Sequence, residues 1–334
     1  MKTAILAILL FCIMIFPHEL GHFIAAKKTG VKVNEFAFGM GPTIWKKQGR
    51  ETLYSIRLFP IGGFCAMEGE DEESDEPRAF TNKKPWQKIV ILAAGSFMNV
   101  VCAVIVMSLV LGIMGFTTTA VDNVQAGSPA SEAGMISGDV IKSIGGADIE
   151  QWSDVPNAIA ASEGKALDVV VDRDGIEKKL NLTPIAGEDG RYVMGITSKI
   201  SHNPFTAVKE GAKATWNMTI TMFDTLKQLF TGKVGTENLS GPVGVVQMVS
   251  ETSEYGFWYY GFLTALICLN LAIINMLPLP ALDGGRIIFV IYTMITGKKV
   301  SQKVEGTIHL IGMALLFALM IYVTFNDVTR IFGR

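Results

Sequence analysis

The pentapeptide HELGH near the start of the chain has the residue types and the spacing of a metal-dependent hydrolase. His18 and His22 lie four residues apart, so on a helix both imidazoles project from one face and can bind one metal ion. Glu19, next to His18, can accept a proton from a water bound to that metal. The motif follows an apolar run without charges, residues 4–16, where ionisable groups are costly unless they serve a function. We therefore interpret HELGH as a metal-binding and catalytic motif.

A catalytic zinc site usually takes three protein ligands and leaves one position for water, so a third ligand is expected elsewhere in the chain. Asp283 is the strongest candidate, because the segment PLPALDGG around it breaks an otherwise apolar helix. Irregular backbone at membrane depth is tolerated where it lines protein or a watery cavity. His309 is the alternative, but it begins an apolar segment with no such break. We predict that Asp283 completes the site.

The composition indicates a membrane protein. Of the 334 residues, 49% are hydrophobic and 18% are charged, which is less charge than a soluble domain of this length usually carries. The net charge of −2 gives no support for nucleic-acid binding as a property of the whole chain. The four cysteines include no CxxC pair, so the sequence predicts neither a disulfide framework nor a cysteine zinc site.

Four segments are predicted to cross the membrane as helices: residues 1–26, 89–115, 255–285 and 308–326. The last three contain uncharged runs that reach the roughly 18–20 residues needed for a span. The first segment spans the bilayer only if its helix continues through HELGH to about Ala26. The alternative is the apolar part of a signal peptide, which we disfavour because no small-residue cleavage site precedes Pro17.

The remaining segments differ in composition. Residues 27–88 predict a β-rich region followed by an acidic loop, and residues 116–200 predict an inserted α+β domain with a hairpin that turns at Asp174-Gly175. An amphipathic or linker region, a cytoplasmic loop and a tail are expected at 201–254, 286–307 and 327–334. The predicted fold class is a polytopic α-helical membrane protein with a β-hairpin region on the cytoplasmic side and an inserted extracytoplasmic α+β domain.

Basic residues near the ends of the spans predict the orientation in the membrane. They flank residues 27–88 and occupy residues 286–307, so both regions are expected to be cytoplasmic. The N-terminus and the inserted domain then lie outside. Arg330 and Arg334, at a C-terminus that would also lie outside, argue mildly against this orientation.

HELGH in the first span and LDGG after a broken later span resemble the site-2 protease family, and most closely the RseP-type bacterial intramembrane metalloproteases. The likeness extends through FAFGMGP, RLFPIGGF, AAGSFMN, GSPASEAGMISGDVI and LNLAIINMLPLPALDGG. It implies one zinc ion per chain, bound by His18, His22 and Asp283, with Glu19 as general base. It also implies that Asn270, Pro278 and Pro280 handle substrate next to the zinc. The inserted domain resembles a single PDZ domain, whereas the best-known proteobacterial relatives have two.

The resemblance implies hydrolysis of a peptide bond within or beside the membrane of a bacterial cell. The expected substrates are single-span membrane proteins already cut outside, such as anti-sigma factors or remnant signal peptides. A helical substrate must become extended to expose its carbonyls, and RLFPIGGF can offer an edge strand for it. The candidate substrate-binding residues in that segment are Arg57, Leu58, Phe59, Pro60, Ile61, Gly62 and Gly63.

Several alternatives stay open at this point. RLFPIGGF can be a purely structural hairpin, and the PDZ-like domain can bind a chain terminus or act as a size filter. For the whole chain, the alternatives are a non-catalytic membrane scaffold that presents a PDZ module and a metal transporter with His and Asp inside the membrane. Glu19 argues against the scaffold, which needs no general base.

Overall fold

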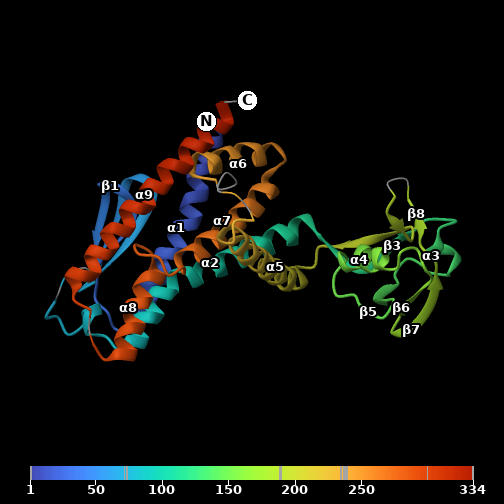
Figure 1. The fold of residues 1–334 in the computed structure, drawn as a ribbon, viewed down its shortest axis with the longest axis horizontal. Helices are drawn as coiled ribbons and strands as arrows, with labels where there is room; N and C mark the ends of the chain where they lie inside the picture. Colours follow the sequence, from blue (N-terminus) through green and yellow to red (C-terminus); the bar gives the residue numbers. More distant parts are fainter. Residues whose placement is uncertain are drawn as a thin grey trace. The chain divides into compact units, whose positions relative to one another are not determined.

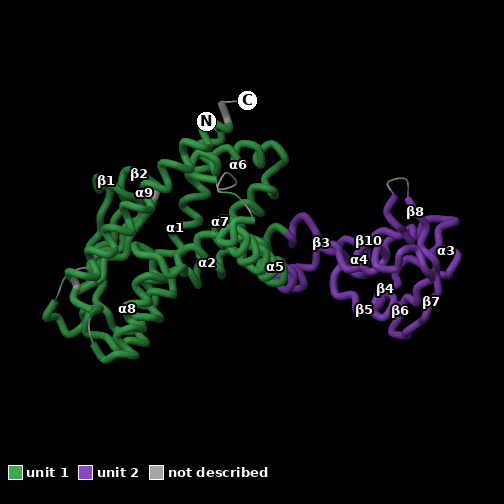
Figure 2. Tube along the Cα trace, viewed as in Figure 1, with its two compact units in different colours: residues 1–110, 211–334 green, residues 111–210 purple. Residues whose placement is uncertain are grey.

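The computed structural model describes residues 2–332 except 71, 73, 188, 189, 234, 236–239 and 299, and it does not describe the side chains of 61, 302, 331 and 332. Two residues of the predicted acidic loop, 71 and 73, therefore lie outside the described residues. The chain divides into two compact units (Figure 2). Unit 1 comprises residues 1–110 and 211–334, and unit 2 comprises residues 111–210.

Four helices are long and apolar enough to cross a membrane. They are α1 (Lys2–Lys28), α2 (Pro85–Met114), α7 (Phe257–Asn275) and the segment Lys303–Arg330 of α9 (Gln302–Phe332). The first turn of α1 and the last turn of α9 lie at the same end of unit 1, as an even number of crossings requires (Figure 1). The prediction of four apolar helices is confirmed, and the side of the membrane on which each loop lies stays a prediction.

Helix α1 runs without interruption through HELGH, although Pro17 lies inside it. A proline in a helix removes the hydrogen bond to the carbonyl four residues earlier, which here belongs to Ile13. The thiol of Cys102 on α2 donates to that carbonyl over 3.8 Å. A side chain from the neighbouring helix thus replaces part of the lost bond, and the helix reaches Lys28 with its histidines in register.

The structure corrects the prediction for residues 255–307. Helix α7 ends at Asn275, residues 276–282 are irregular, and a further helix α8 (Asp283–Thr296) occupies much of the predicted cytoplasmic loop. The glycines that indicated a break lie in the first turn of α8, because the irregular segment packs directly on them. A Cβ at Gly284 would lie 2.6 Å from the backbone carbon of Met276, and one at Gly285 would lie 2.8 Å from that of Leu279.

Two helices lie within residues 201–254, which were predicted as an amphipathic or linker region. The amphipathic segment is helical as α5 (Pro204–Phe230), and α6 (Pro242–Glu254) was not predicted. Val249 of α6 packs with Ala7 and Leu10 of α1. The buried carboxylate of Asp327 on α9 accepts hydrogen bonds from backbone N–H groups at the start of α6, at 2.9 and 2.8 Å.

The β-rich region of unit 1 consists of two long strands, β1 (Val33–Gln48) and β2 (Leu53–Met67), followed by the short helix η1 (Phe80–Asn82). The first half of β1 has partners in both halves of β2, since Phe36 is opposite both Tyr54 and Cys65. Gly39, Gly41 and Gly62 take positive φ values where the strands bend. Among the described residues, the last part of β2, residues 63–67, pairs only with β1, so its other edge is unpaired.

Unit 2 is an α+β domain around one apolar core that includes Ile141, Ile144, Val169 and Val171. Its main sheet has the order β10-β3-β4-β6-β7, with β5 beside β4. The strands are β3 (Phe116–Val124), β4 (Val140–Ile144), β5 (Ala147–Asp148), β6 (Leu167–Arg173), β7 (Ile176–Leu182) and β10 (Ile196–Ser201). Helices α3 (Pro129–Glu132) and α4 (Asp154–Ala161) and the strand pair β8 (Ile185–Ala186) and β9 (Tyr192–Val193) complete it. The hairpin predicted at Asp174-Gly175 is confirmed between β6 and β7.

Candidate metal centre

Helices α1 and α8 bring His18, His22 and Asp283 together, although the aspartate lies more than 260 residues from the histidines. The Nε2 atoms of the two histidines are 3.2 Å apart, and each lies 3.4 Å from Oδ2 of Asp283. The two histidines are buried, and the Asp283 side chain is 18% exposed. The structure therefore places the three predicted ligands in one cluster; that they bind a metal stays a proposal.

The hydrogen bonding around the cluster fits a cation. His22 Nδ1 lies 2.9 Å from the carbonyl oxygen of Ile91, which can only accept, so Nδ1 carries the hydrogen and Nε2 turns its lone pair toward the cluster. Asp283 Oδ2 has no hydrogen-bond partner among the described residues. Facing lone pairs and an unpartnered buried carboxylate oxygen are unfavourable unless a positive charge lies between them. Two imidazoles and one carboxylate are also an ordinary protein ligand set for catalytic zinc.

Small residues on α1 and α2 let the two helices approach closely at the cluster. A Cβ at Gly95 would lie 2.7 Å from Cε1 and 2.8 Å from Nδ1 of His18, and one at Gly21 would lie 2.7 Å from the backbone carbon of Ala94. Larger side chains at either position would force the helices apart or turn the imidazoles. Gly95 belongs to the AAGSFMN segment, so this part of the motif shapes the site without contributing a polar group.

Glu19 follows His18 on α1 and is half-buried. A Cβ at Gly63 of β2 would lie 3.4 Å from Cγ of Glu19, so the edge strand of the small sheet passes beside the Glu19 side chain. The absence of a side chain at Gly63 also lets the strand approach the backbone of Ala37, whose carbonyl oxygen would lie 2.9 Å from an added Cβ.

The structure places a further asparagine beside the cluster, while the substrate-handling role of Asn270 stays a prediction. That residue is exposed on α7, whereas Nδ2 of Asn275, the last residue of the helix, lies 3.3 Å from His18 Nε2. Five residues correspond to about 140° of rotation on a helix, so the two asparagines point to different sides. The signal that could have found Asn275 is its place at the end of the helix, three residues before Pro278.

The two prolines of the broken segment have different surroundings. Pro278 is exposed, and Pro280 lies against α9, where a Cβ at Gly312 would be 2.8 Å from the backbone carbon of Pro280. Neither proline contacts the three-residue cluster in the described hydrogen bonds or ion pairs.

Residues 57–63 of β2 divide into anchored and exposed positions. Arg57 pairs with Glu35 at 2.8 Å and lies over the ring of Phe64, while Leu58 and Phe59 are 51% and 56% exposed. The Pro60 carbonyl accepts from the thiol of Cys12 on α1 over 3.4 Å. Gly62 takes a positive φ and Gly63 adjoins Glu19, while the side chain of Ile61 lies outside the described residues. The segment is therefore fixed to α1 and leaves apolar side chains free.

Two further polar residues near the centre were not assigned a role from the sequence. Asn99, one turn beyond Gly95 on α2, is fully buried, and neither side-chain polar atom has a partner among the described residues. Arg286, in the first turn of α8, forms an ion pair with Glu70 that links α8 to the residues after β2. His309 is not part of the cluster. Its Nδ1 instead accepts a hydrogen bond from the Ala281 N–H at 2.8 Å.

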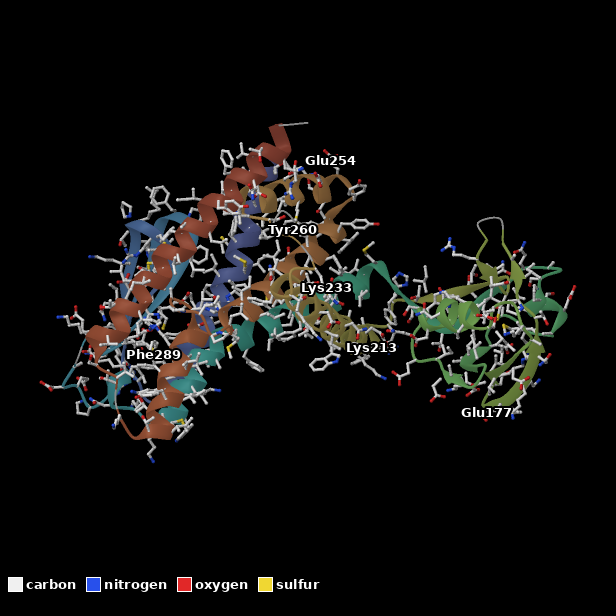
Figure 3. All side chains as sticks on the ribbon, in the orientation of Figure 1. Glu177, Lys213, Lys233, Glu254, Tyr260 and Phe289 are labelled. Atoms are coloured by element: carbon white, nitrogen blue, oxygen red, sulfur yellow. The ribbon has the colours of Figure 1, made fainter. Side chains whose placement is uncertain are left out.

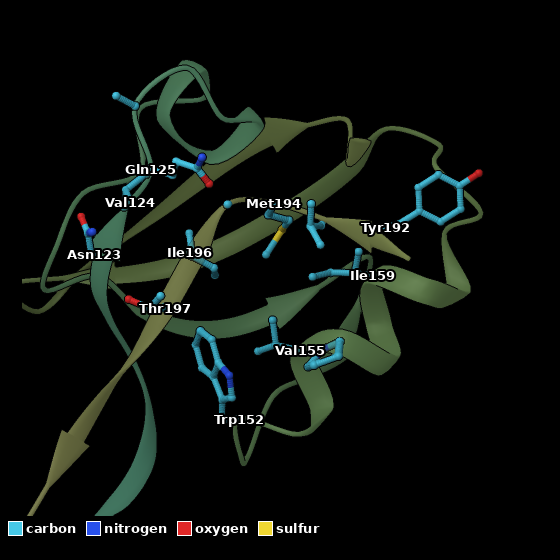
Figure 4. Close-up of a pocket in the computed structure, with 14 residues that line it drawn as sticks. Asn123, Val124, Gln125, Trp152, Val155, Ile159, Tyr192, Met194, Ile196 and Thr197 are labelled. Atoms are coloured by element: carbon cyan, nitrogen blue, oxygen red, sulfur yellow. The ribbon is translucent and has the colours of Figure 1, made fainter. Parts of the chain in front are cut away.

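Unit 2 contains a cavity of its own. It has a volume of about 780 Å³ and is lined by α4, by the end of β3 and by residues 192–197. Figure 4 shows Trp152, Val155 and Ile159 on one side and Met194 and Ile196 on the other. None of the described residues that line it is charged, and most of them are apolar.

Comparison with known proteins gives three findings. The sequence model of peptidase family M50 matches residues 6–319. A protein of Clostridium acetobutylicum named as a zinc metalloprotease is 39% identical over 329 residues, covering 97% of this chain and 96% of that protein. The regulator of sigma-W protease RasP of Bacillus subtilis is 30% identical over 420 residues. The alignment covers 99% of this chain and 99% of that protein.

A solved PDZ domain of an SdrC-like protein from Listeria monocytogenes is 18% identical to this chain, with a TM-score of 0.23. The match covers 25% of this chain and 88% of the PDZ domain. This likeness carries no argument about the fold. The PDZ-like assignment of residues 116–200 therefore rests on the sequence resemblance.

Proposed function

The chain belongs to peptidase family M50, and from this membership we propose that it is an intramembrane zinc metallopeptidase whose zinc is held by His18, His22 and Asp283, with Glu19 as general base. The convergence of three buried ligand atoms is the observation that carries this proposal, since they lie within 4.8 Å of one another. They come from α1 and from the first turn of α8, directly after apolar helix α7.

When bound, zinc supplies Lewis acidity, because it polarises a carbonyl oxygen and lowers the pKa of water. The residues of this chain supply orientation and proton transfer. The Ile91 carbonyl fixes the His22 ring by accepting from Nδ1–H, so that Nε2 stays available. Glu19 takes a proton from the attacking water and returns it to the amine of the departing chain. The amide of Asn275, at the edge of the cluster, can donate to a substrate carbonyl once His18 Nε2 is engaged.

We assign the presentation of substrate to the unpaired edge of β2, residues 63–67. An extended chain that pairs with this edge would pass near Glu19, because Gly63 lies beside the Glu19 side chain. Pairing on a sheet edge also satisfies the backbone groups of a substrate that has left its helical form. The exposed side chains of Leu58 and Phe59 on the same strand supply apolar contacts.

The proposed substrates are single-span membrane proteins, either membrane-bound regulators such as anti-sigma factors or remnant signal peptides. The name of the Bacillus subtilis relative connects that protein with the sigma-W factor, and this supports the first class. The proposed location is the bacterial cytoplasmic membrane, with the N-terminus and unit 2 outside and the β1–β2 sheet on the cytoplasmic side. Unit 2 would then meet substrates first and restrict their size or bind their cut ends.

The test is cleavage of a purified single-span substrate by the purified chain in detergent, with and without a zinc chelator. Glu19→Gln should keep its zinc and lose cleavage by about 100-fold or more, since glutamine cannot accept the proton. Metal content of the same sample separates loss of the base from loss of zinc. Cleavage by Glu19→Gln at close to the wild-type rate would contradict the proposal. Zinc transport into sealed vesicles, without cleavage, would favour a transporter.

A further inference from the structure

The segment that carries the chain from α7 to Asp283 contains a strained residue. Ala281 has a φ of 73°, in the left-handed region that residues with a Cβ rarely adopt. It lies two residues before Asp283, so its backbone angles set the direction in which α8 and its first carboxylate begin. Such a conformation persists when surrounding groups hold it.

His309 on α9 supplies the group that holds it. Nδ1 of His309 accepts the N–H of Ala281 at 2.8 Å, which requires Nδ1 to be unprotonated. A backbone N–H at membrane depth must find an acceptor inside the protein, because lipid offers none. The bond therefore satisfies the hydrogen-bond donor of Ala281. It also favours the backbone conformation in which the Ala281 N–H points toward His309.

Neighbouring contacts fix the imidazole and the bend together. The ring of His309 packs against Phe289 of α8 with ring centres 5.7 Å apart, and Figure 3 marks Phe289 on that helix. Gly312, one turn further along α9, lets the helix approach Pro280. Helix α9 thus contacts the segment at Pro280 and Ala281 and contacts α8 beyond it.

We propose that His309 is a positioning residue that aims Asp283, by holding Ala281 in its left-handed conformation through Nδ1. The proposal rests on the function proposed above in one respect only, namely that Asp283 binds zinc. It assigns to α9 a role in the metal centre even though α9 contributes no atom to it.

The variants Asn, Gln and Leu at position 309 separate this role from general packing. Asparagine places its carbonyl oxygen at the position of Nδ1, glutamine reaches further toward the position of Nε2, and leucine offers no acceptor. Leu310→Ala is the matched control on the same helix, because Leu310 is 67% exposed. Ala281→Gly in the His309→Leu background removes the need for the bond, since glycine adopts positive φ without strain.

The first measurement is hydrogen exchange of the peptide that contains Ala281, in the full-length, metal-free chain in detergent. His309→Leu and His309→Gln should exchange about 10-fold faster or more than the wild type, while His309→Asn and Leu310→Ala should not, because only they keep an acceptor at Nδ1. Unchanged exchange in His309→Leu, or loss of protection in His309→Asn equal to that in His309→Leu, would overturn the proposal.

The second measurement is zinc affinity. His309→Leu should raise the dissociation constant about 10-fold, the usual effect of removing a group that orients a ligand, and adding Ala281→Gly should restore most of it. Failure of Ala281→Gly to restore affinity would overturn the role assigned to the strained bend. If the wild-type chain bound no zinc, the function proposed above would fail, and the exchange measurement would still decide the role of His309.

Discussion

The metal centre of unit 1 and the cavity of unit 2 differ in the atoms that they leave without partners. The centre brings together a carboxylate oxygen of Asp283 and the rings of two histidines, and neither Asp283 Oδ2 nor His18 Nδ1 has a hydrogen-bond partner among the described residues. The cavity has a volume of about 780 Å³ and an uncharged, mostly apolar lining that comes from α4 and from strands. Buried polar atoms without partners indicate chemistry, whereas open apolar space indicates binding.

Charged groups in the two units show the same difference. In unit 2, the buried carboxylate of Asp139 forms two hydrogen bonds with the Arg173 guanidinium, at 2.7 and 2.8 Å, and also accepts the N–H of Ile136. In unit 1, Oδ2 of Asp283 lies 3.4 Å from the Nε2 atoms of His18 and His22. This oxygen has no hydrogen-bond partner among the described residues. The first carboxylate is fully hydrogen-bonded, whereas the second has an oxygen without a hydrogen-bond partner among the described residues.

The largest expected effect comes from adding one methyl group at the centre. Gly95→Ala places a Cβ 2.7 Å from Cε1 of His18, so the imidazole must move and zinc affinity should fall about 100-fold or more, the upper range seen when ligand orientation is lost. Gly306→Ala on α9 is the control, because no atom lies within 4 Å of its added Cβ. Equal zinc affinity in the two variants, measured by competition with a chelator, would contradict the packing described for Gly95.

A smaller effect is expected from deleting residues 117–199 of unit 2. Zinc content should stay that of the full chain, because all three proposed ligands lie in unit 1. Short substrates should still be cut, and substrates with longer outer segments should be cut faster than by the full chain. Loss of all cleavage in a deletion variant that retains zinc would show that unit 2 does more than restrict access.

The smallest effect concerns the pH dependence of unit 2. Burial raises the pKa of Asp139, but the hydrogen bonds and charge of Arg173 outweigh it and hold the pKa below its ordinary 3.8. The unfolded state therefore binds more protons between the two values, so the stabilisation is fully present above about pH 4 and is lost as the pH falls through the folded pKa.

Asp139→Asn removes this dependence and also weakens the fold at neutral pH, because Arg173 loses its partner. The measurement is the urea midpoint of unit 2 between pH 3 and pH 6, followed by Trp152 fluorescence in a chain whose other tryptophans are replaced by phenylalanine. An Asp139→Asn variant whose midpoint falls with acid as steeply as that of the parent would show that other groups control the pH dependence.

Local spacing was sufficient to predict part of the site. His18 and His22 share a face because four residues make about one helical turn, and this holds wherever the helix lies. Asp283 was predicted from the cost of breaking a membrane helix, which requires a functional or structural reason. The structure brings these three residues together, and their role as ligands stays a prediction.

Contacts between distant segments were not predictable in the same way. The place of Asn275 beside His18 was not predicted, because the end of α7 depends on how residues 276–282 pack onto Gly284 and Gly285. Those glycines indicated only a break, so helix α8 was missed. The hydrogen bond between His309 and Ala281 forms because α9 packs against residues 280 and 281. A local sequence pattern does not predict such packing between distant segments.

The central claim is that Asp283 completes a zinc site with His18 and His22. Asp283→Ala, dialysed against a mild chelator beside the wild type and Asp327→Ala, tests it most directly, because Asp327 is a buried carboxylate that caps α6 instead. We predict one zinc per chain in the wild type and in folded Asp327→Ala, and at least about 10-fold weaker retention in Asp283→Ala. Full zinc content in Asp283→Ala would contradict the account.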